Sequence, residues 1–201
     1  MKKIVLLAIS MFLFFTTFTH CVYAASGIET IVIMRHGEKP KIKNGQINCQ
    51  GFNRALSLTH VLVHKFGRPD FIYAPNPENG EKNHYLRAIA TIEPTAISLQ
   101  LPVDPSYKVD DHHGIVNELL SKSYRGSTIF VTWEHKHAVK IARLLMKELD
   151  QDPDLIPKWK KGDFDSLYVI KIDWENKKPI VSFNVDHENL NGQSVVCPNE
   201  A

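Results

Sequence analysis

The segment from Ile31 to Pro40 constrains the fold more than any other part of the sequence. Four apolar residues, Ile31 to Met34, are typical of a buried strand, and Arg35, His36 and Gly37 follow them directly. Ligands of open α/β sheets bind at the carboxyl ends of the strands, and glycine there lets the backbone turn sharply or approach a ligand closely. By itself, the segment fits both a binding site and a solvated loop that follows a strand.

Strand and helix signals alternate along most of the chain. Strands are predicted over Thr30 to Met34, Phe71 to Ala74 and Ser127 to Trp133, and helices over Gln50 to Lys65, Leu86 to Leu99, Gly114 to Leu120 and Lys136 to Leu149. Within the second helix, Pro94 should either kink the helix or mark its true start. This alternation predicts an α/β fold with a mostly parallel sheet and helices on both of its faces.

The C-terminal part departs from this alternation. Ser166 to Ile172 and Pro179 to Val185 both alternate as strands do, on either side of the turn residues 175–178. They predict an antiparallel hairpin at the edge of the sheet. The preceding stretch, Asp150 to Asp165, is rich in Pro, Lys and Asp, and either covers a site or only connects two elements.

The N-terminus has the pattern of a secretory signal. Lys2 and Lys3 precede an apolar stretch that ends near Phe18, and Val22-Tyr23-Ala24 offers small residues for cleavage before Ala25. The stretch is short for a membrane span, which needs about 20 apolar residues, although an uncleaved anchor is the alternative. We therefore expect a signal peptide over residues 1–24, a single domain over residues 25–201, and a periplasmic or secreted protein with no stable membrane insertion after cleavage.

Overall charge points to no polyanionic macromolecule as a partner. The leader holds two lysines and no acidic residue, so the remaining chain carries 22 basic and 22 acidic residues. Neither nucleic acid nor an anionic membrane surface is indicated. Locally, however, Lys39, Lys41, Lys43 and Arg54 follow the His36 segment. They would either create a positive field that attracts anionic ligands or form a solvated loop.

Two cysteines remain after the leader, Cys49 and Cys197. In an oxidising compartment an even pair predicts one disulfide, which would tie the loop after the first strand to the C-terminal tail. Two separate thiols are the alternative. Neither cysteine has a second potential ligand at the spacing of a zinc site.

Three strand ends bring cations or imidazoles to one edge of the predicted sheet. The first strand ends in Arg35-His36, the second leads through its loop to Arg87, and the third ends in Glu134-His135. Guanidinium groups bind phosphate oxygens through paired, charge-assisted hydrogen bonds, and histidine can act as a nucleophile near neutral pH. Two arginines and two histidines around one pocket therefore predict a site for a tetrahedral dianion.

These motifs resemble the histidine phosphatase superfamily, which includes the cofactor-dependent phosphoglycerate mutases. The resemblance spans Ile31 to Leu145 and rests on Arg35-His36-Gly37, on Arg87-Ala88-Ile89-Ala90-Thr91-Ile92-Glu93-Pro94 and on His135. It implies a three-layer α/β/α sandwich and a phosphatase that needs no metal or other cofactor. His36 would become phosphorylated, Arg35 and Arg87 would clamp the phosphoryl oxygens, and His135 would hydrogen-bond the phosphoryl group in the transition state.

The proton donor is where this chain departs from the family. In the acid phosphatase and phytase branch an aspartate follows the second histidine, but here the next residue is Lys136. The mutase-like branch places an acidic residue after the helix of the second arginine. Candidates for the general acid are Glu134, Asp110, Asp111 and Glu118, and the sequence does not choose among them.

Other interpretations follow from the same residues. A non-catalytic binder of phosphorylated ligands would use the arginines without a proton donor, and a mutase would have to keep water from the phosphoenzyme. His135 with His137, and His112 with His113, suggest a zinc site but form no complete ligand set. Trp133 is either a core residue or a wall of the pocket. Small phosphomonoesters are the expected substrates, and the sequence predicts neither their identity nor the oligomeric state.

Overall fold

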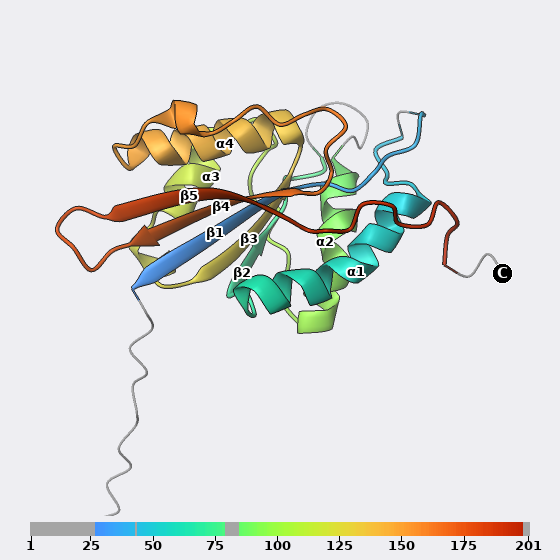
Figure 1. Cartoon of the computed structure of the whole chain (residues 1–201), viewed down its shortest axis with the longest axis horizontal. Coiled ribbons are helices and arrows are strands. Elements are labelled where there is room, and N and C mark those ends of the chain that lie inside the picture. The colour runs from blue at the N-terminus through green and yellow to red at the C-terminus, as the bar shows by residue number, and fades with distance from the viewer. Residues whose placement is uncertain (1–26, 43, 79–84, 199–201) are drawn as a thin grey trace, which may run out of the picture.

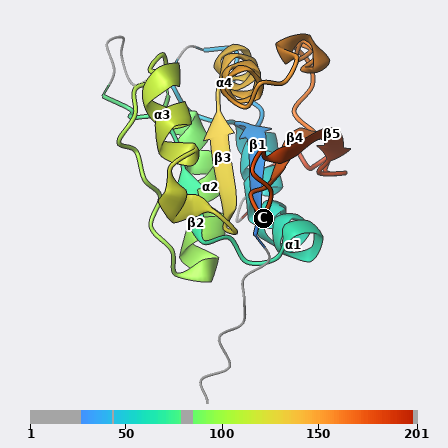
Figure 2. The same ribbon diagram turned by 90° about the vertical axis from the view of Figure 1, so that its left-hand side faces the viewer.

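A five-stranded sheet forms the middle layer of this computed structural model, which describes residues 27–42, 44–78 and 85–198 (Figure 1). The strands are β1 (Ile28–Arg35), β2 (Phe71–Tyr73), β3 (Thr128–Trp133), β4 (Ser166–Asp173) and β5 (Ile180–His187). Their order is β2-β3-β1-β4-β5, which Figure 2 shows from one end of the sheet. The strands β2, β3 and β1 run parallel, whereas β4 pairs antiparallel with both β1 and β5.

Helices cover both faces of the sheet. The helices α1 (Cys49–Phe66) and α2 (Leu86–Leu99) pack on one face, and α3 (His112–Leu119) and α4 (His135–Glu148) pack on the other. Two short 3₁₀ helices, η1 (Lys122–Tyr124) and η2 (Pro153–Leu155), follow α3 and α4. The three-layer fold with a C-terminal antiparallel hairpin, predicted from the sequence, is thereby confirmed.

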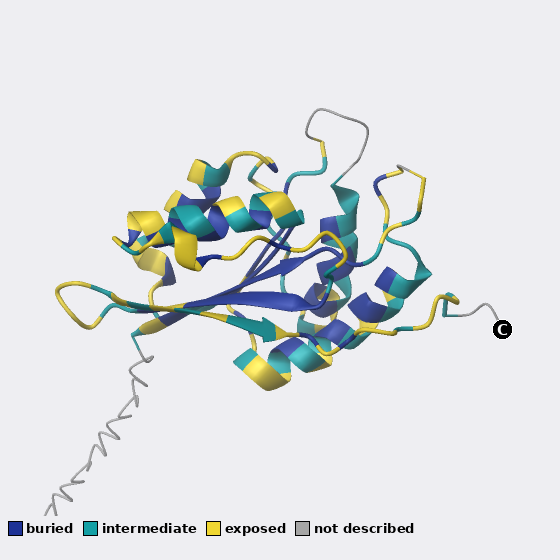
Figure 3. Cartoon of the chain, turned by 45° about the horizontal axis from the view of Figure 1, so that its top comes forward, coloured by how far each residue is buried: buried dark blue, intermediate teal, exposed yellow. Residues whose placement is uncertain are grey.

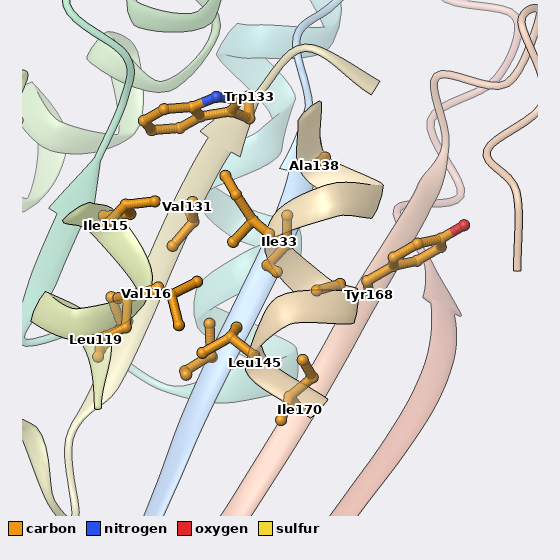
Figure 4. Packing of buried hydrophobic residues seen from close by; sticks show 14 of the residues in the cluster. Ile33, Ile115, Val116, Leu119, Val131, Trp133, Ala138, Leu145, Tyr168 and Ile170 are labelled. Carbon is orange, nitrogen blue, oxygen red and sulfur yellow. The ribbon is translucent and has the colours of Figure 1, made fainter. Parts of the chain in front are cut away.

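The alternation of side chains along β1 explains the three layers. Ile31 and Ile33 point towards α3 and α4, whereas Val32 and Met34 point towards α1 and α2, and all four are fully buried. Figure 4 shows the first face, where Ile33 lies between strand and helix side chains. Figure 3 shows that the buried residues follow the strands through the middle of the molecule. A central strand that is covered by helices on both faces of the sheet requires an uninterrupted apolar sequence, because side chains on both faces are buried.

The predicted elements occur close to their predicted bounds, with one correction. The helix α2 begins at Leu86, so Pro94 lies inside it and the alternative in which Pro94 marks its start is wrong. Proline has no N–H, so Pro94 cannot donate the usual helical hydrogen bond to the carbonyl of Ala90. The helix tolerates this loss because Ile92 and Ala96, on either side of Pro94, are buried against the sheet.

The predicted signal peptide, residues 1–24, lies outside the described residues. Among the helices of the described ranges, none is both long enough and apolar enough to cross a membrane. The predicted disulfide is present: Cys49, the first residue of α1, is bonded to Cys197 in the C-terminal segment. It closes a loop across a sequence separation of 148 residues.

A buried ion cluster ties four distant segments together around Arg54. This side chain of α1 is fully buried and lies 2.8 Å from Oε1 of Glu38, 3.3 Å from Oδ1 of Asp165 and 2.6 Å from Oε2 of Glu188. Burial raises the pKa of Glu188 to about 8 against the opposing charge of Arg54. The cluster joins the loop after β1, the helix α1 and the segments that flank the C-terminal hairpin.

Replacement of Arg54 by methionine should destabilise the protein by about 3–5 kcal/mol, because it leaves buried carboxylates without their cation. The control is Lys65→Met, which removes a partly exposed ion pair of 2.9 Å with Asp186 on the same helix and should cost less than about 1 kcal/mol. Urea unfolding at neutral pH measures both values. Similar losses in the two variants would show that the buried cluster is not a special constraint.

Candidate active site

The parallel pairing of β1 and β3 brings two histidines to one edge of the sheet. Arg35 lies opposite Trp133 in the register, and the backbone N–H of His36 donates a hydrogen bond of 3.1 Å to the carbonyl of Trp133. His36 directly follows β1, and His135 is the first residue of α4, two positions after β3. The predicted convergence of these two strand ends is therefore found in the structure.

His36 is buried and held in one tautomer. Its Nδ1 lies 2.8 Å from the carbonyl oxygen of Gly37, which can only accept, so Nδ1 carries the proton and Nε2 keeps its lone pair. Burial, with smaller contributions from the charges of Arg35, Arg87 and Lys39, lowers the pKa of His36 to about 3. The imidazole is thus neutral at pH 7, with Nε2 available as a nucleophile.

Gly37 allows the loop after β1 to lie directly against α1. A Cβ atom at Gly37 would come within 3.0 Å of the backbone of Gly51, and a Cβ at Gly51 would come within 2.5 Å of the carbonyl oxygen of Glu38. Gly37, predicted to permit a sharp turn or a close approach to a ligand, permits a close approach of two backbone segments. That contact fixes the position of His36 relative to α1.

Arg35 is buried, and it shapes a neighbouring segment as well as the site. Its Nη1 donates hydrogen bonds to the carbonyl oxygens of Lys161 at 2.8 Å and Asp163 at 2.7 Å, and its Cζ lies 3.9 Å from the centre of the Phe164 ring. Its buried Nε makes no hydrogen bond to any residue that the structure describes. Burial lowers the pKa of Arg35 to about 10, while the charge of Glu134 opposes this shift. Arg35 remains a cation at neutral pH with at least one N–H group to offer.

Arg87 reaches the same region from the first turn of α2. The hydroxyl of Thr91, one helical turn later, donates to the carbonyl of Arg87 at 2.7 Å and accepts from the N–H of Gly37 at 2.9 Å. Thr91 thus joins α2 to the loop that carries His36. Burial lowers the pKa of Arg87, and the nearby Glu134 opposes this shift. Sequence reasoning did not single out Thr91, although its position four residues after Arg87 on a helix would have placed both on one face.

Glu134 and His135 form a close pair at the start of α4. Oε1 of Glu134 lies 2.5 Å from Nδ1 of His135, but outside hydrogen-bonding geometry, and Oε2 accepts from the N–H groups of Lys136 at 2.8 Å and His137 at 3.3 Å. Burial lowers the pKa of His135, and the charge of Glu134 counteracts it. Glu134 therefore serves both as the N-cap of α4 and as the carboxylate nearest to His135 in sequence and space.

Of the four predicted proton-donor candidates, Glu134 is the one whose charge acts on Arg35, Arg87 and His135 together. Asp111 caps α3 by accepting from the N–H of Gly114, and Glu118 accepts from the hydroxyls of Tyr107 and Tyr124. Asp110 is exposed and acts electrostatically on His112 and His137. These contacts favour Glu134 over the other three.

The stretch before β4, for which the sequence allows either a cover over a site or a simple connection, lines a cavity beside His135. This cavity of about 720 Å³ is bounded by Glu134 and His135 on one side and by Lys158, Trp159 and Lys161 on another. Trp159 is the aromatic residue at its wall. Trp133, by contrast, is fully buried and donates from Nε1 to the carbonyl of Val109, so it is a core residue.

The predicted positive field after His36 loses one of its four members, Arg54. Arg54 is neutralised within its buried carboxylate cluster and does not face a ligand. Lys39 lines the cavity, Lys41 is exposed, and Lys43 lies outside the described residues. Sequence proximity failed here because α1 turns Arg54 into the protein, where Glu38, Asp165 and Glu188 surround it.

The fold brings together one histidine from each of the two pairs considered for zinc. Nε2 of His112 lies 2.8 Å from Nδ1 of His137, and burial lowers the pKa of both rings. His135 instead pairs with Glu134. Within the described part of the chain, no three His, Cys, Asp or Glu side chains are grouped so as to hold a metal ion.

Comparisons with known proteins agree with this architecture. No known family profile matches the sequence, and no curated protein matches it. Among solved structures, the chain is similar to a protein described as phosphohistidine phosphatase SixA from Nakamurella multipartitia, with a TM-score of 0.55, 16% identity, and coverage of 80% of this chain and 96% of that one. A protein histidine phosphatase SixA complexed with tungstate gives a TM-score of 0.53 at 15% identity, covering 79% and 97%.

A phosphoglycerate mutase from Plasmodium falciparum is also similar, with a TM-score of 0.50 and 14% identity over 77% of this chain and 89% of that one. These likenesses show the fold. The chain has the α/β/α fold of the histidine phosphatase superfamily, in its phosphoglycerate mutase-like form.

The imidazole of His36 should remain neutral from about pH 8 to about pH 5, because its folded-state pKa is about 3. Nitrogen-15 NMR of labelled histidine measures both its protonation and its tautomer, and we expect the Nδ1–H form. In urea the same residue should titrate near the ordinary value of about 6.5. A folded-state titration near pH 6.5, or an Nε2–H form, would contradict the described environment.

The same pKa difference affects stability. Between about pH 6.5 and about pH 3, the unfolded chain binds a proton at His36 that the folded chain does not bind. The contribution of the neutral His36 to the free energy of unfolding is therefore complete above about pH 6.5 and is lost as the pH falls towards about 3. The unfolding free energy of His36→Asn should therefore decrease less steeply than that of the wild type between about pH 6.5 and 5.

Proposed function

We propose that this protein is an exported, metal-independent phosphatase that hydrolyses phosphomonoesters through a phosphohistidine intermediate on His36. The observation that carries the proposal is the state of His36. It is a buried, neutral imidazole whose Nε2 keeps its lone pair, and the positive charges of Arg35, Arg87 and Lys39 act on it. A neutral nucleophile among cations suits attack on a phosphate dianion.

The first chemical step is phosphoryl transfer to the enzyme. Nε2 of His36 attacks phosphorus, a phosphorus–nitrogen bond forms, and the bond from phosphorus to the ester oxygen breaks. Arg35, through groups such as its buried Nε, and Arg87 neutralise the equatorial oxygens. His135, just past the end of the neighbouring strand β3, would donate a hydrogen bond to the same oxygens.

The second step releases inorganic phosphate. Water attacks phosphorus, the phosphorus–nitrogen bond breaks, and His36 returns to its neutral form with Nδ1–H still directed at the carbonyl of Gly37. The open cavity beside His135 gives water a route to the phosphoenzyme. This access favours a phosphatase over a mutase.

Glu134 is our assignment for the proton donor. It lines the cavity together with His135, and its charge is the foremost one opposing the burial shifts of both Arg35 and Arg87. In the first step the protonated carboxyl of Glu134 would give its proton to the departing ester oxygen, and in the second step the resulting carboxylate would accept a proton from the attacking water, which restores the acid.

Similar structures support this chemistry without establishing it. One of them is described as a protein histidine phosphatase complexed with tungstate, which is a tetrahedral oxyanion like phosphate. The Cys49–Cys197 disulfide supports an oxidising location, and the sequence pattern of residues 1–24 supports export to the periplasm or beyond.

The decisive experiment uses p-nitrophenyl phosphate with the purified wild type, with His36→Ala and with His60→Ala, an exposed histidine of α1. We expect His36→Ala to lose at least about a thousandfold in kcat, because the covalent route is removed, while His60→Ala keeps its activity. An acid-labile phosphoenzyme should form in the wild type and in His60→Ala alone. A metal chelator should leave turnover unchanged.

Several outcomes would redirect the proposal. Phosphate binding without turnover or phosphoenzyme in any protein would favour the non-catalytic binder. Transfer of the phosphoryl group to an added phosphoglycerate in preference to water would favour a mutase. Inactivation by the chelator would contradict the metal-free mechanism.

Leaving-group dependence tests the proton donor. Glu134→Gln should lower kcat/KM by about a hundredfold or more for an alkyl phosphate and by much less for p-nitrophenyl phosphate, whose leaving group needs no proton. Glu118→Gln is the control, since its carboxylate is engaged by Tyr107 and Tyr124. If Asp110→Asn shows this dependence and Glu134→Gln does not, the donor is Asp110.

A further inference from the structure

Five lysines gather around the cavity beside His135. Two come from α4, one from the loop after β1, and two from the segment between η2 and β4: Lys136, Lys140, Lys39, Lys158 and Lys161. We call this cavity with these five residues the lysine pocket. Among the described residues that line it, Glu134 is the one acidic residue. The pocket therefore carries a strong excess of positive charge next to the proposed phosphoryl site.

The ammonium groups of these lysines are not neutralised by ion pairs within the described part of the chain. None of the five forms an ion pair with any residue in the described ranges, although other lysines such as Lys65 do. Lys136 and Lys140 are four residues apart on α4, where like charges are mutually unfavourable. Lys39 lies close enough to Arg35, Arg87 and Lys161 that their charges lower its pKa, in addition to the larger effect of burial. An anion in the pocket would relieve this repulsion.

The segment that supplies Lys158 and Lys161 is firmly positioned. Arg35 holds the carbonyls of Lys161 and Asp163, and Nε1 of Trp159 donates to the carbonyl of Asp163 at 3.1 Å. The carboxylate of Asp163 in turn accepts from the hydroxyl of Ser166 at 2.6 Å. The residue that would bind the reacting phosphate thus also fixes this wall of the lysine pocket.

The pocket shares two residues with the proposed catalytic site. Glu134 and His135 belong to both, and Lys39, which lines the pocket, lies close enough to Arg35 and Arg87 for their charges to lower its pKa. Its volume of about 720 Å³ is sufficient for the remainder of a sugar-sized substrate. Lysine ammonium groups on flexible stems suit a compact, highly charged group such as a second phosphate.

We propose that the lysine pocket is a second anion-binding site, and that the preferred substrates are small phosphomonoesters that carry a second phosphate group. The inference rests on the proposed phosphate chemistry at His36 and names the substrate class of that site. One phosphate occupies the arginine and histidine site for transfer, while the other is held by the lysines. The carbon skeleton between them lies along the wall that includes Trp159.

Equilibrium binding to the His36→Ala protein tests this without turnover. The two probes are fructose 1,6-bisphosphate and fructose 6-phosphate, which differ by one phosphate. We expect the bisphosphate to bind at least about tenfold more tightly, and this preference to decrease between about 0.02 M and about 0.5 M salt because the interaction is electrostatic. Equal affinities for the two probes would overturn the proposal.

The matched variants add Lys140→Gln with Lys158→Gln, or Lys147→Gln alone, to the His36→Ala background. Lys147 is an exposed residue of α4 that does not line the pocket. The double replacement should reduce the bisphosphate preference to less than about threefold, while Lys147→Gln should leave it intact. An equal reduction by Lys147→Gln would show that only overall charge matters, and would also overturn the proposal.

Failure of the proposed function is distinguishable from failure of this inference. A bisphosphate preference in binding, together with no turnover by the wild type, would leave the second anion site standing and remove the phosphatase. Turnover by the wild type with equal affinities would leave the phosphatase and remove the second site.

Discussion

The parallel pairing of β1 with β3 is the constraint on which the rest of the site depends. Its hydrogen bonding continues one residue past the end of β1, where the N–H of His36 reaches the carbonyl of Trp133. This places His36 beside the start of α4, and hence beside His135. Because β1 is the central strand and is buried on both faces, the position of His36 is fixed by the whole core.

Buried electrostatics complete the site and connect it to its surroundings. Arg35 is a buried cation whose charge acts on His36, and it also organises the segment before β4 through two backbone carbonyls. Arg54 performs a purely structural task nearby, because three carboxylates enclose it. Arg35 and Arg54 lie near each other in the sequence but have different environments in the folded protein. The difference lies in what each side chain meets after folding: backbone carbonyl groups for Arg35, and compensating carboxylates for Arg54.

Most of the fold was predictable because its signals are local and repeated. The apolar runs of β1 and β3, the amphipathic pattern of α4 and the alternating C-terminal strands each specify an element from neighbouring residues alone. The four predicted site residues Arg35, His36, Arg87 and His135 could be grouped because parallel strand ends meet at one edge. The role of the stretch before β4 could not be predicted, since its contacts with Arg35 are made by backbone carbonyls, which carry no sequence signal.

The sequence by itself determined the layer architecture, the strand ends that carry cations and imidazoles, and the pairing of Cys49 with Cys197 as one of two options. Only the tertiary structure decided that His36 is neutral with its proton on Nδ1, that Glu134 rather than Glu118 or Asp111 lies against His135, and that lysines from three separate segments line one cavity. The physical reason is that periodicity and residue type report local preferences. Burial, tautomer and charge balance depend on which distant groups meet, and that is settled only when the chain packs.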